Sequence, residues 1–182
     1  MIEVRWHGRG GQGAVTSVEL LAVAAIAAGK YAQGFPSFGP ERRGAPVAAF
    51  TRIDDKKINV RSGIYEPDVV LILDASLIGM VDVTDGLKPG GKVVVNTTKS
   101  PDEIRKDLNF SGTVATVDGT GIARKEMGVP IANTTMIGAL LKVTGIMGLE
   151  AMKDSVEHRF GRIAQKNINA MKRAYDEIKI SN

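Results

Sequence analysis

Two hydrophobic periods alternate along this chain, and each predicts a different kind of element. Short apolar runs bounded by turn residues predict strands at 2–6, 30–35, 46–53, 57–60, 69–74, 92–97 and 113–118. The third and fourth of these would form a hairpin around Asp54-Asp55. Apolar residues recur at helical spacing from Val15 to Ala28, and they predict a helix that Gly29 ends.

The later part of the chain predicts mainly helices. Residues 100–103, Ser-Pro-Asp-Glu, combine an N-cap serine, a proline in the first turn and a capping-box glutamate. After Pro130 the chain is predicted to be entirely helical. Asn133 would cap a helix that runs to about residue 147, and an amphipathic helical region would cover 156–178.

This alternation of buried strands and helices predicts a Rossmann-like, three-layer α/β/α sandwich around a mostly parallel, mixed sheet, with a helical C-terminal region. A length of 182 residues suits one sizeable core, so we expect 1–182 to form a single domain. In such sheets, ligands bind beyond the carboxyl ends of the parallel strands. Polar residues follow the buried runs at that edge: Asp74, Asn96 and Asp118.

The segment HGRGGQGAV, His7–Val15, joins the first strand to the first helix and holds four glycines within six residues. Gly8, Gly10 and Gly13 fit the G-x-G-x-x-G spacing, which favours phosphate binding at a helix N-terminus. A backbone this free of side chains indicates close approach to a ligand or to a neighbouring chain, and the composition leaves both open.

Two familiar nucleotide sites fit this loop poorly. A dinucleotide site needs a carboxylate about 20 residues further on for the ribose, but no Asp or Glu lies between Glu19 and Glu41. A P-loop needs a Lys-Ser/Thr pair after the last glycine, and Ala14-Val15 stand there instead.

A second unusual segment, FPSFGPERRGAP at 35–46, contains three prolines and two adjacent arginines. The prolines restrict the backbone, so we expect a shaped loop. Arg42 or Arg43 would bind a phosphate or carboxylate through its guanidinium. Alternatively, Glu41 and Arg43 would form an ion pair that only shapes the loop.

Composition excludes several chemistries on this chain. It has no cysteine, which excludes disulfides, a thiol nucleophile and cysteine-ligated iron–sulfur clusters here. Two histidines argue against a protein-built zinc site, and a net charge of +4 without a basic stripe argues against nucleic acid. Without an apolar run of ~18 residues or a signal peptide, we expect no membrane segment and a cytoplasmic location.

No catalytic triad and no paired acid and base accompany these loops. His7, Asp74 and Asp118 are the isolated candidates, and each is as readily explained as a structural hydrogen-bonding or capping residue. We therefore expect a binding domain that has no complete catalytic apparatus of its own.

The two loops together resemble the gamma subunit of the 2-oxoacid:ferredoxin oxidoreductases, most of all that of the pyruvate branch, pyruvate synthase. The resemblance rests on HGRGGQGA followed by FPSFGPERRGAPVAAFTRI, and continues through VRSGIYEPDVVLILD, VVVNTT and IANTTMIGALLKVTGI. It therefore covers nearly the whole chain.

The resemblance implies an enzyme complex that converts pyruvate, coenzyme A and oxidised ferredoxin to acetyl-CoA, CO2 and reduced ferredoxin, reversibly. Thiamine diphosphate, Mg and iron–sulfur clusters would lie on alpha, beta and delta subunits. This chain would contribute to the coenzyme A cleft and to assembly, and the isolated chain, inactive by itself, would form at most a homodimer. Coenzyme A would contact Gly8, Arg9, Gly10, Gly11, Gln12, Gly13, Phe38, Gly39, Glu41, Arg42, Arg43, Asn133 and Thr134.

Three alternatives stay open at this stage. The chain would belong to a 2-oxoglutarate or branched-chain oxidoreductase, or act as an interaction scaffold whose loops touch only other subunits. The third is an independent Rossmann-type nucleotide-binding enzyme, which the missing ribose carboxylate disfavours.

Overall fold

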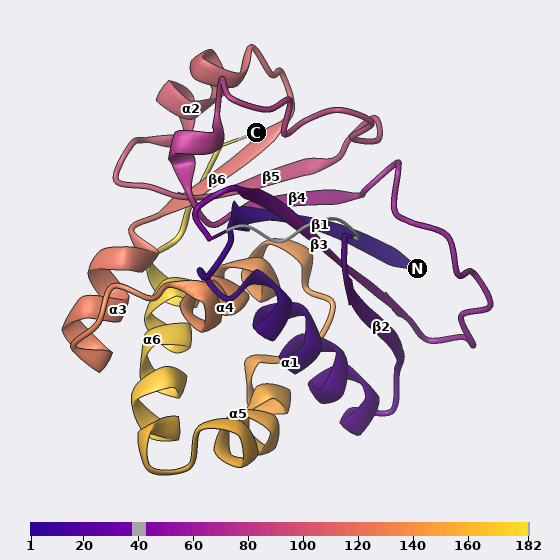
Figure 1. The fold of residues 1–182 in the computed structure, drawn as a ribbon, viewed down its shortest axis with the longest axis vertical. Coiled ribbons are helices and arrows are strands. Elements are labelled where there is room, and N and C mark those ends of the chain that lie inside the picture. The colour runs from indigo at the N-terminus through magenta and orange to yellow at the C-terminus, as the bar shows by residue number, and fades with distance from the viewer. Residues whose placement is uncertain (38–42, 182) are drawn as a thin grey trace.

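One seven-stranded sheet organises the residues that the computed structural model describes, 1–37 and 43–181 (Figure 1). The strand order is β2-β3-β1-β4-β5-β6-β7. Neighbours among β1, β4, β5 and β6 pair in parallel, whereas β3 and β7 pair antiparallel, so the predicted mixed, mostly parallel sheet is confirmed. The strands are β1 Ile2–Arg9, β2 Tyr31–Pro36, β3 Pro46–Asp54, β4 Val69–Ile72, β5 Lys92–Asn96, β6 Thr113–Val117 and β7 Lys179–Ser181.

The two faces of the sheet carry unequal helical layers. The α-helices are α1 Ala14–Ala27, α2 Pro101–Leu108, α3 Gly119–Met127, α4 Asn133–Thr144, α5 Lys153–Phe160 and α6 Ala164–Glu177. Short 3-10 turns lie at η1 Ala75–Leu77, η2 Leu149–Met152 and η3 Gly161–Ile163. Figure 1 shows α2 on one face and the other α-helices on the opposite face, which is the predicted three-layer sandwich. No helix within 1–37 or 43–181 is long and apolar enough to cross a membrane.

Burial explains why the strand patterns differ. Strands β4 and β5 are buried on both faces, so their sequences are continuous apolar runs. Strand β1 alternates instead: Val4 and Trp6 enter the core beneath the large helical layer, and Glu3, Arg5 and His7 face the other side. Trp6 is fully buried, and its indole N–H donates to the Thr51 hydroxyl at 3.1 Å.

Several local predictions are confirmed. The helix α1 ends before Gly29, whose φ of 82° is in the left-handed region that favours glycine. At the start of α2, the Ser100 hydroxyl accepts from the Glu103 amide, and the Glu103 carboxylate accepts from the Ser100 amide. The capping box therefore forms as its spacing predicts.

Three other predictions are wrong. Residues 57–60 form no strand, and the hairpin partner of β3 is β2, with Phe35 opposite Phe50. The chain after Pro130 is not entirely helical, because β7 adds a strand to β6 at the end of the sheet. Asn133 is the first residue of α4 and not its cap, and the helix stops at Thr144 rather than near residue 147. The strand errors concern long-range pairing and the Asn133 cap concerns side-chain direction, which a local period does not encode. The helix end is a local signal that the prediction overlooked, because Gly145 adopts the left-handed conformation with φ of 62°.

Candidate functional site

The glycine loop, Gly10–Gly13, lies between the carboxyl end of β1 and the first residue of α1. Strand β4 ends beside β1, where the Leu73 amide donates to the His7 carbonyl at 2.7 Å. After β1 the chain builds β2 and β3 on one side of it, and after β4 it builds the rest of the sheet on the other. Open α/β sheets bind ligands at this kind of reversal, so the loop occupies the expected crevice.

Hydrogen bonds of Arg9 and Asp74 hold the glycine loop against the end of β4. The guanidinium donates from Nε to Asp74 Oδ2 at 3.1 Å, from Nη1 to the Gly44 carbonyl at 3.1 Å and from Nη2 to the Ser76 hydroxyl at 2.8 Å. Gln12 donates to the same Asp74 oxygen at 2.8 Å, and its own side-chain oxygen accepts from the Arg9 amide at 2.8 Å. Arg9 is thus a clamp between three segments, with each of its nitrogens engaged.

The Asp74 carboxylate stays ionised under most conditions. Burial alone would raise its pKa, but hydrogen bonds from Ser76 and Gln12, together with the Arg9 charge, hold the pKa below the usual aspartate range. The anion therefore remains the acceptor that the Arg9 clamp requires.

The end of the second loop lies against the glycine loop. The Gly10 amide donates to the Ala45 carbonyl at 2.9 Å, and the Gly44 amide donates to the Gly10 carbonyl at 3.0 Å. A side chain added at Gly11 would begin 3.9 Å from Arg43 Cγ, which places the Arg43 side chain over the loop. Arg43 is exposed, so it is the described cation best placed to bind an anion there.

Two helices begin at this edge without a side-chain cap from any described residue. Gly13 precedes α1 and Ala132 precedes α4, and neither helix has an acidic residue in its first turn. The helix starts meet where Asn133 Nδ2 donates to the Gly13 carbonyl at 3.4 Å. Free N-terminal amides and the positive ends of two helix dipoles therefore converge here, which suits an anionic ligand.

A small cavity of about 130 Å³ completes the crevice, between Gly11, Gln12 and residues 130–133. Its floor is Asn96 at the end of β5, whose amide group donates to the Leu73 carbonyl and the Thr120 hydroxyl, both at 2.9 Å. The volume admits a few water-sized groups. A large ligand would therefore lie across the open edge and only touch this cavity.

The His7 side chain hydrogen-bonds within its own strand, and it does not line the cavity beside the glycine loop. Its Nε2 accepts a hydrogen bond from Arg5 Nε at 3.1 Å. Burial, reinforced by the Arg5 charge, lowers the pKa of His7 to about 4, so the ring is neutral near pH 7. The structural interpretation of this histidine fits these contacts better than a ligand role.

The structure brings most of the predicted contact residues together, and one of them lies deeper. Thr134 is 1 % exposed and donates its hydroxyl to Asn167 at 2.7 Å, inside the contact between α4 and α6. Phe38, Gly39, Glu41 and Arg42 lie outside the described residues. The predicted residues that meet at the edge are Gly8, Arg9, Gly10, Gly11, Gln12, Gly13, Arg43 and Asn133.

Sequence reasoning missed the partners of Arg9. Ser76 and Met80 accept from Nη2 at 2.8 and 3.2 Å, although they are 67 and 71 residues away. Of the Arg9 partners, only Asp74 could be placed near the loop from the sequence. It follows a buried strand, and the carboxyl ends of parallel strands meet at one edge of the sheet.

Comparison with known proteins supplies the family. Residues 3–177 match the family model "Pyruvate ferredoxin/flavodoxin oxidoreductase". The chain belongs to this family. It is 54% identical to the pyruvate/ketoisovalerate oxidoreductases common subunit gamma of Thermococcus kodakarensis, over 97% of both chains. It is 52% identical to the pyruvate synthase subunit PorC of Methanocaldococcus jannaschii, over 98% of this chain and 97% of that one.

A solved structure agrees with these relatives. The pyruvate oxidoreductase subunit PORC of Thermotoga maritima superposes with a TM-score of 0.90 at 42% identity, covering 100% of this chain and 98% of that one. The resemblance and the fold predicted from the sequence are therefore confirmed. The chain is a gamma-type subunit of a multi-subunit pyruvate:ferredoxin oxidoreductase complex.

Proposed function

We propose that this subunit supplies one wall of the cleft in which coenzyme A approaches the reacting centre of the complex. The complex would oxidise pyruvate with release of CO2, pass the two electrons to ferredoxin and transfer the acetyl group to the coenzyme A thiol. This chain would hold the phosphate-bearing part of coenzyme A, and a partner would hold the pyruvate.

The observation that carries this proposal is the convergence of two uncapped helix starts with Arg43 at the glycine loop. Phosphate oxygens are strong acceptors, and they suit free amides, helix N-termini and a guanidinium. Glycine at Gly11, where φ is 91°, lets the ligand approach the backbone closely. We assign Arg9 to positioning this edge, because Asp74, Gly44 and Ser76 engage its guanidinium.

We place the remaining cofactors on the partner subunits, alpha, beta and delta. Thiamine diphosphate with Mg would supply the carbanion chemistry at the pyruvate carbonyl, and iron–sulfur clusters would carry the electrons. This chain has no cysteine to ligate such clusters. Its own contribution is binding, orientation and exclusion of water at the coenzyme A side.

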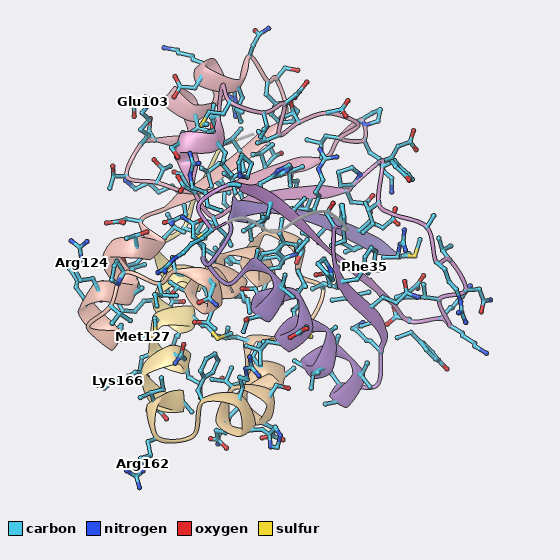
Figure 2. All side chains as sticks on the ribbon, in the orientation of Figure 1. Phe35, Glu103, Arg124, Met127, Arg162 and Lys166 are labelled. Carbon is cyan, nitrogen blue, oxygen red and sulfur yellow. The ribbon has the colours of Figure 1, made fainter. Side chains whose placement is uncertain are left out.

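The test is steady-state kinetics of the assembled complex with an Arg43→Gln subunit. We expect the KM for coenzyme A to rise roughly tenfold while kcat and the KM for pyruvate stay constant, because one charged phosphate contact is lost. Arg162→Gln is the matched control, since Arg162 is also exposed but lies at the far end of the molecule (Figure 2). An unchanged KM for coenzyme A in an assembled Arg43→Gln complex would remove the cleft role.

A second function is favoured by one specific observation. The Thermococcus relative is named as a subunit common to pyruvate and ketoisovalerate oxidoreductases. A subunit shared in this way contacts what the two reactions have in common, coenzyme A, and leaves the choice of 2-oxoacid to a partner. Reconstitution of this chain with partner subunits of each specificity tests sharing: one gamma subunit would then support both activities.

A further inference from the structure

A second and larger recess lies over the β1, β3 and β2 part of the sheet, and no glycine-loop residue lines it. This groove of about 1060 Å³ is lined by residues 33–37 on one side and by Arg61, Ile64 and Tyr65 on the other. Successive residues of a strand point to opposite faces. Arg5 of β1 and Phe50 of β3 also line the recess, and Phe50 is the cross-strand neighbour of both Arg5 and Phe35 (Phe35 is labelled in Figure 2). The recess therefore lies over one face of the sheet and reaches outward to β2, the edge strand.

The β2 backbone is unsatisfied along this edge. The Ser37 amide donates to the Ala48 carbonyl, and strand register continues this pairing through Phe35 and Gln33. Hydrogen-bonded and non-hydrogen-bonded pairs alternate in an antiparallel ladder, so the polar backbone groups of Ala32 and Gly34 point away from β3. Within the described ranges no other residue bonds to them. Such groups pair readily with an added strand.

The wall opposite β2 is held in place by buried side chains of the sheet. Arg52 is 2 % exposed in its side chain, pairs with Glu3 at 2.7 Å and donates to the Gly63 carbonyl at 3.0 Å. Arg5 donates to the Val83 carbonyl at 3.1 Å, and Gln33 donates to the Val60 carbonyl at 3.1 Å. The groove is therefore already formed in the free subunit, which reduces the ordering cost of binding.

Large apolar side chains surround the same edge. Tyr31 of β2 is 48 % exposed and Tyr65 of the opposite wall is 77 % exposed, with Val60 between them along the chain. On α1, which packs against β2, Val23 and Ile26 also face solvent. Exposed apolar side chains on both sides of an open strand edge indicate a protein contact.

We propose that an extended segment of a partner subunit pairs with the outer edge of β2 as an eighth strand of the sheet, and that the side chains it directs to one face border this groove. The edge of β2 offers backbone pairing, and aromatic side chains flank it on both sides. Apolar side chains of the segment would contact Tyr31 and Tyr65, and an acidic one would pair with the exposed Arg61.

Backbone pairing also suits the proposed role of this subunit in more than one enzyme. Main-chain hydrogen bonds depend little on the partner's side chains, so segments of different sequence can pair with the same edge. The proposal rests on assembly with partner subunits, which the proposed function includes, and not on the coenzyme A cleft.

The direct test is hydrogen–deuterium exchange of the native complex and of the free subunit. We expect the Ala32 and Gly34 amides to exchange at least tenfold more slowly in the complex. Equal rates in both samples would overturn the proposal. Protection by coenzyme A alone would also contradict it, as would protection that grows with the concentration of the free subunit, because that result indicates a second copy.

Competition for assembly provides the second test. Ala32→Pro removes an outward amide without removing a bond to β3, and Ala32→Ser keeps that amide. Expressed beside a differently tagged wild-type chain, Ala32→Pro should enter the complex at least tenfold less often, and Ala32→Ser equally often. Ile163→Asp, at an exposed apolar residue on η3, should also compete equally.

Thermal unfolding of the free Ala32→Pro chain shows whether the variant is folded. Equal incorporation of a folded Ala32→Pro chain would refute the strand pairing. Failure of the coenzyme A proposal would be seen differently: the KM for coenzyme A would stay constant in fully assembled Arg43→Gln complexes.

Discussion

Helices of this subunit begin in two different ways. Ser100 caps α2, and the Asp118 carboxylate caps α3 by accepting from the Gly121 amide at 2.8 Å. Gly13 and Ala132, which precede α1 and α4, provide no such side chain. The two uncapped helices meet at the glycine loop. The capped helix α2 lies on the other face of the sheet, and α3 begins beside the cavity next to the loop, but Asp118 occupies its first amides. The helices α5 and α6 continue from 3-10 turns and need no separate cap.

This difference separates structural starts from starts that face a ligand. A capped helix has its first amides satisfied inside the protein, so capping adds stability and closes the site. An uncapped start leaves those amides for water or for an anion. The helices α1 and α4 therefore lack the stabilisation of a side-chain cap at the place where the proposed ligand binds.

The largest effect is expected from Gly13→Ala. Gly13 and Gly29 have nearly equal φ values of 83° and 82°, but a Cβ on Gly13 would lie 2.4 Å from Asn133 Nδ2, whereas Gly29 has open space around it. We expect Gly13→Ala to lower the free energy of unfolding by about 3 kcal/mol and Gly29→Ala by about 1 kcal/mol, measured in urea.

Adding Asn133→Ala should recover part of the Gly13→Ala loss, because it removes the clashing atoms. Equal losses for Gly13→Ala and Gly29→Ala would mean that the two helix starts do not pack closely.

Asp74 gives the next effect and adds a pH dependence. Asp74→Asn should lower the free energy of unfolding by about 2 kcal/mol at pH 7, because the clamp loses its charged acceptor. The folded-state pKa of Asp74 is depressed, so its contribution is present above the ordinary aspartate pKa of 3.8 and is lost as the pH falls through the folded value. Wild type and variant should therefore converge in acid, as chemical denaturation between pH 7 and pH 2 would show.

Removing a structural cap should cost less and leave the ligand unaffected. Ser100→Ala should lower the free energy of unfolding by about 1 kcal/mol and leave the KM for coenzyme A constant. A changed KM for coenzyme A in this variant would contradict the proposal that capped helix starts are structural and that only the uncapped starts bind the ligand.

The smallest change in stability is expected from Thr16→Glu, in the first turn of α1. A carboxylate there interacts favourably with the helix dipole, so the free energy of unfolding should rise by about 0.5 kcal/mol. The same charge repels phosphate, so the KM for coenzyme A should also rise, and Thr16→Gln should change neither quantity much. A stabilised Thr16→Glu complex with an unaltered KM would show that the α1 start faces no anion.

Local sequence was sufficient where neighbours along the chain determine the outcome. The capping box at Ser100 and the left-handed Gly29 depend on residues within one turn, and both were predicted. Prediction failed for β7 and for the partner of β3, since strand pairing depends on distant segments that compete for the same edge. Asn133 has the chemistry of a cap, but packing directs its side chain to Gly13.

Local patterning was enough to predict the class of fold, the glycine loop and the family. Doubly buried strands must be continuous apolar runs, and a loop of four glycines survives only where side chains cannot fit. Which polar groups are free depends on contacts between distant segments of the folded chain. The fold engages Arg9 with Asp74, buries Thr134 and leaves Arg43 and the β2 edge open. A hydrogen-bond donor is available to a ligand or a partner only if no acceptor of the chain itself lies within about 3 Å of it. Residues far apart in the sequence reach that distance only when the chain folds.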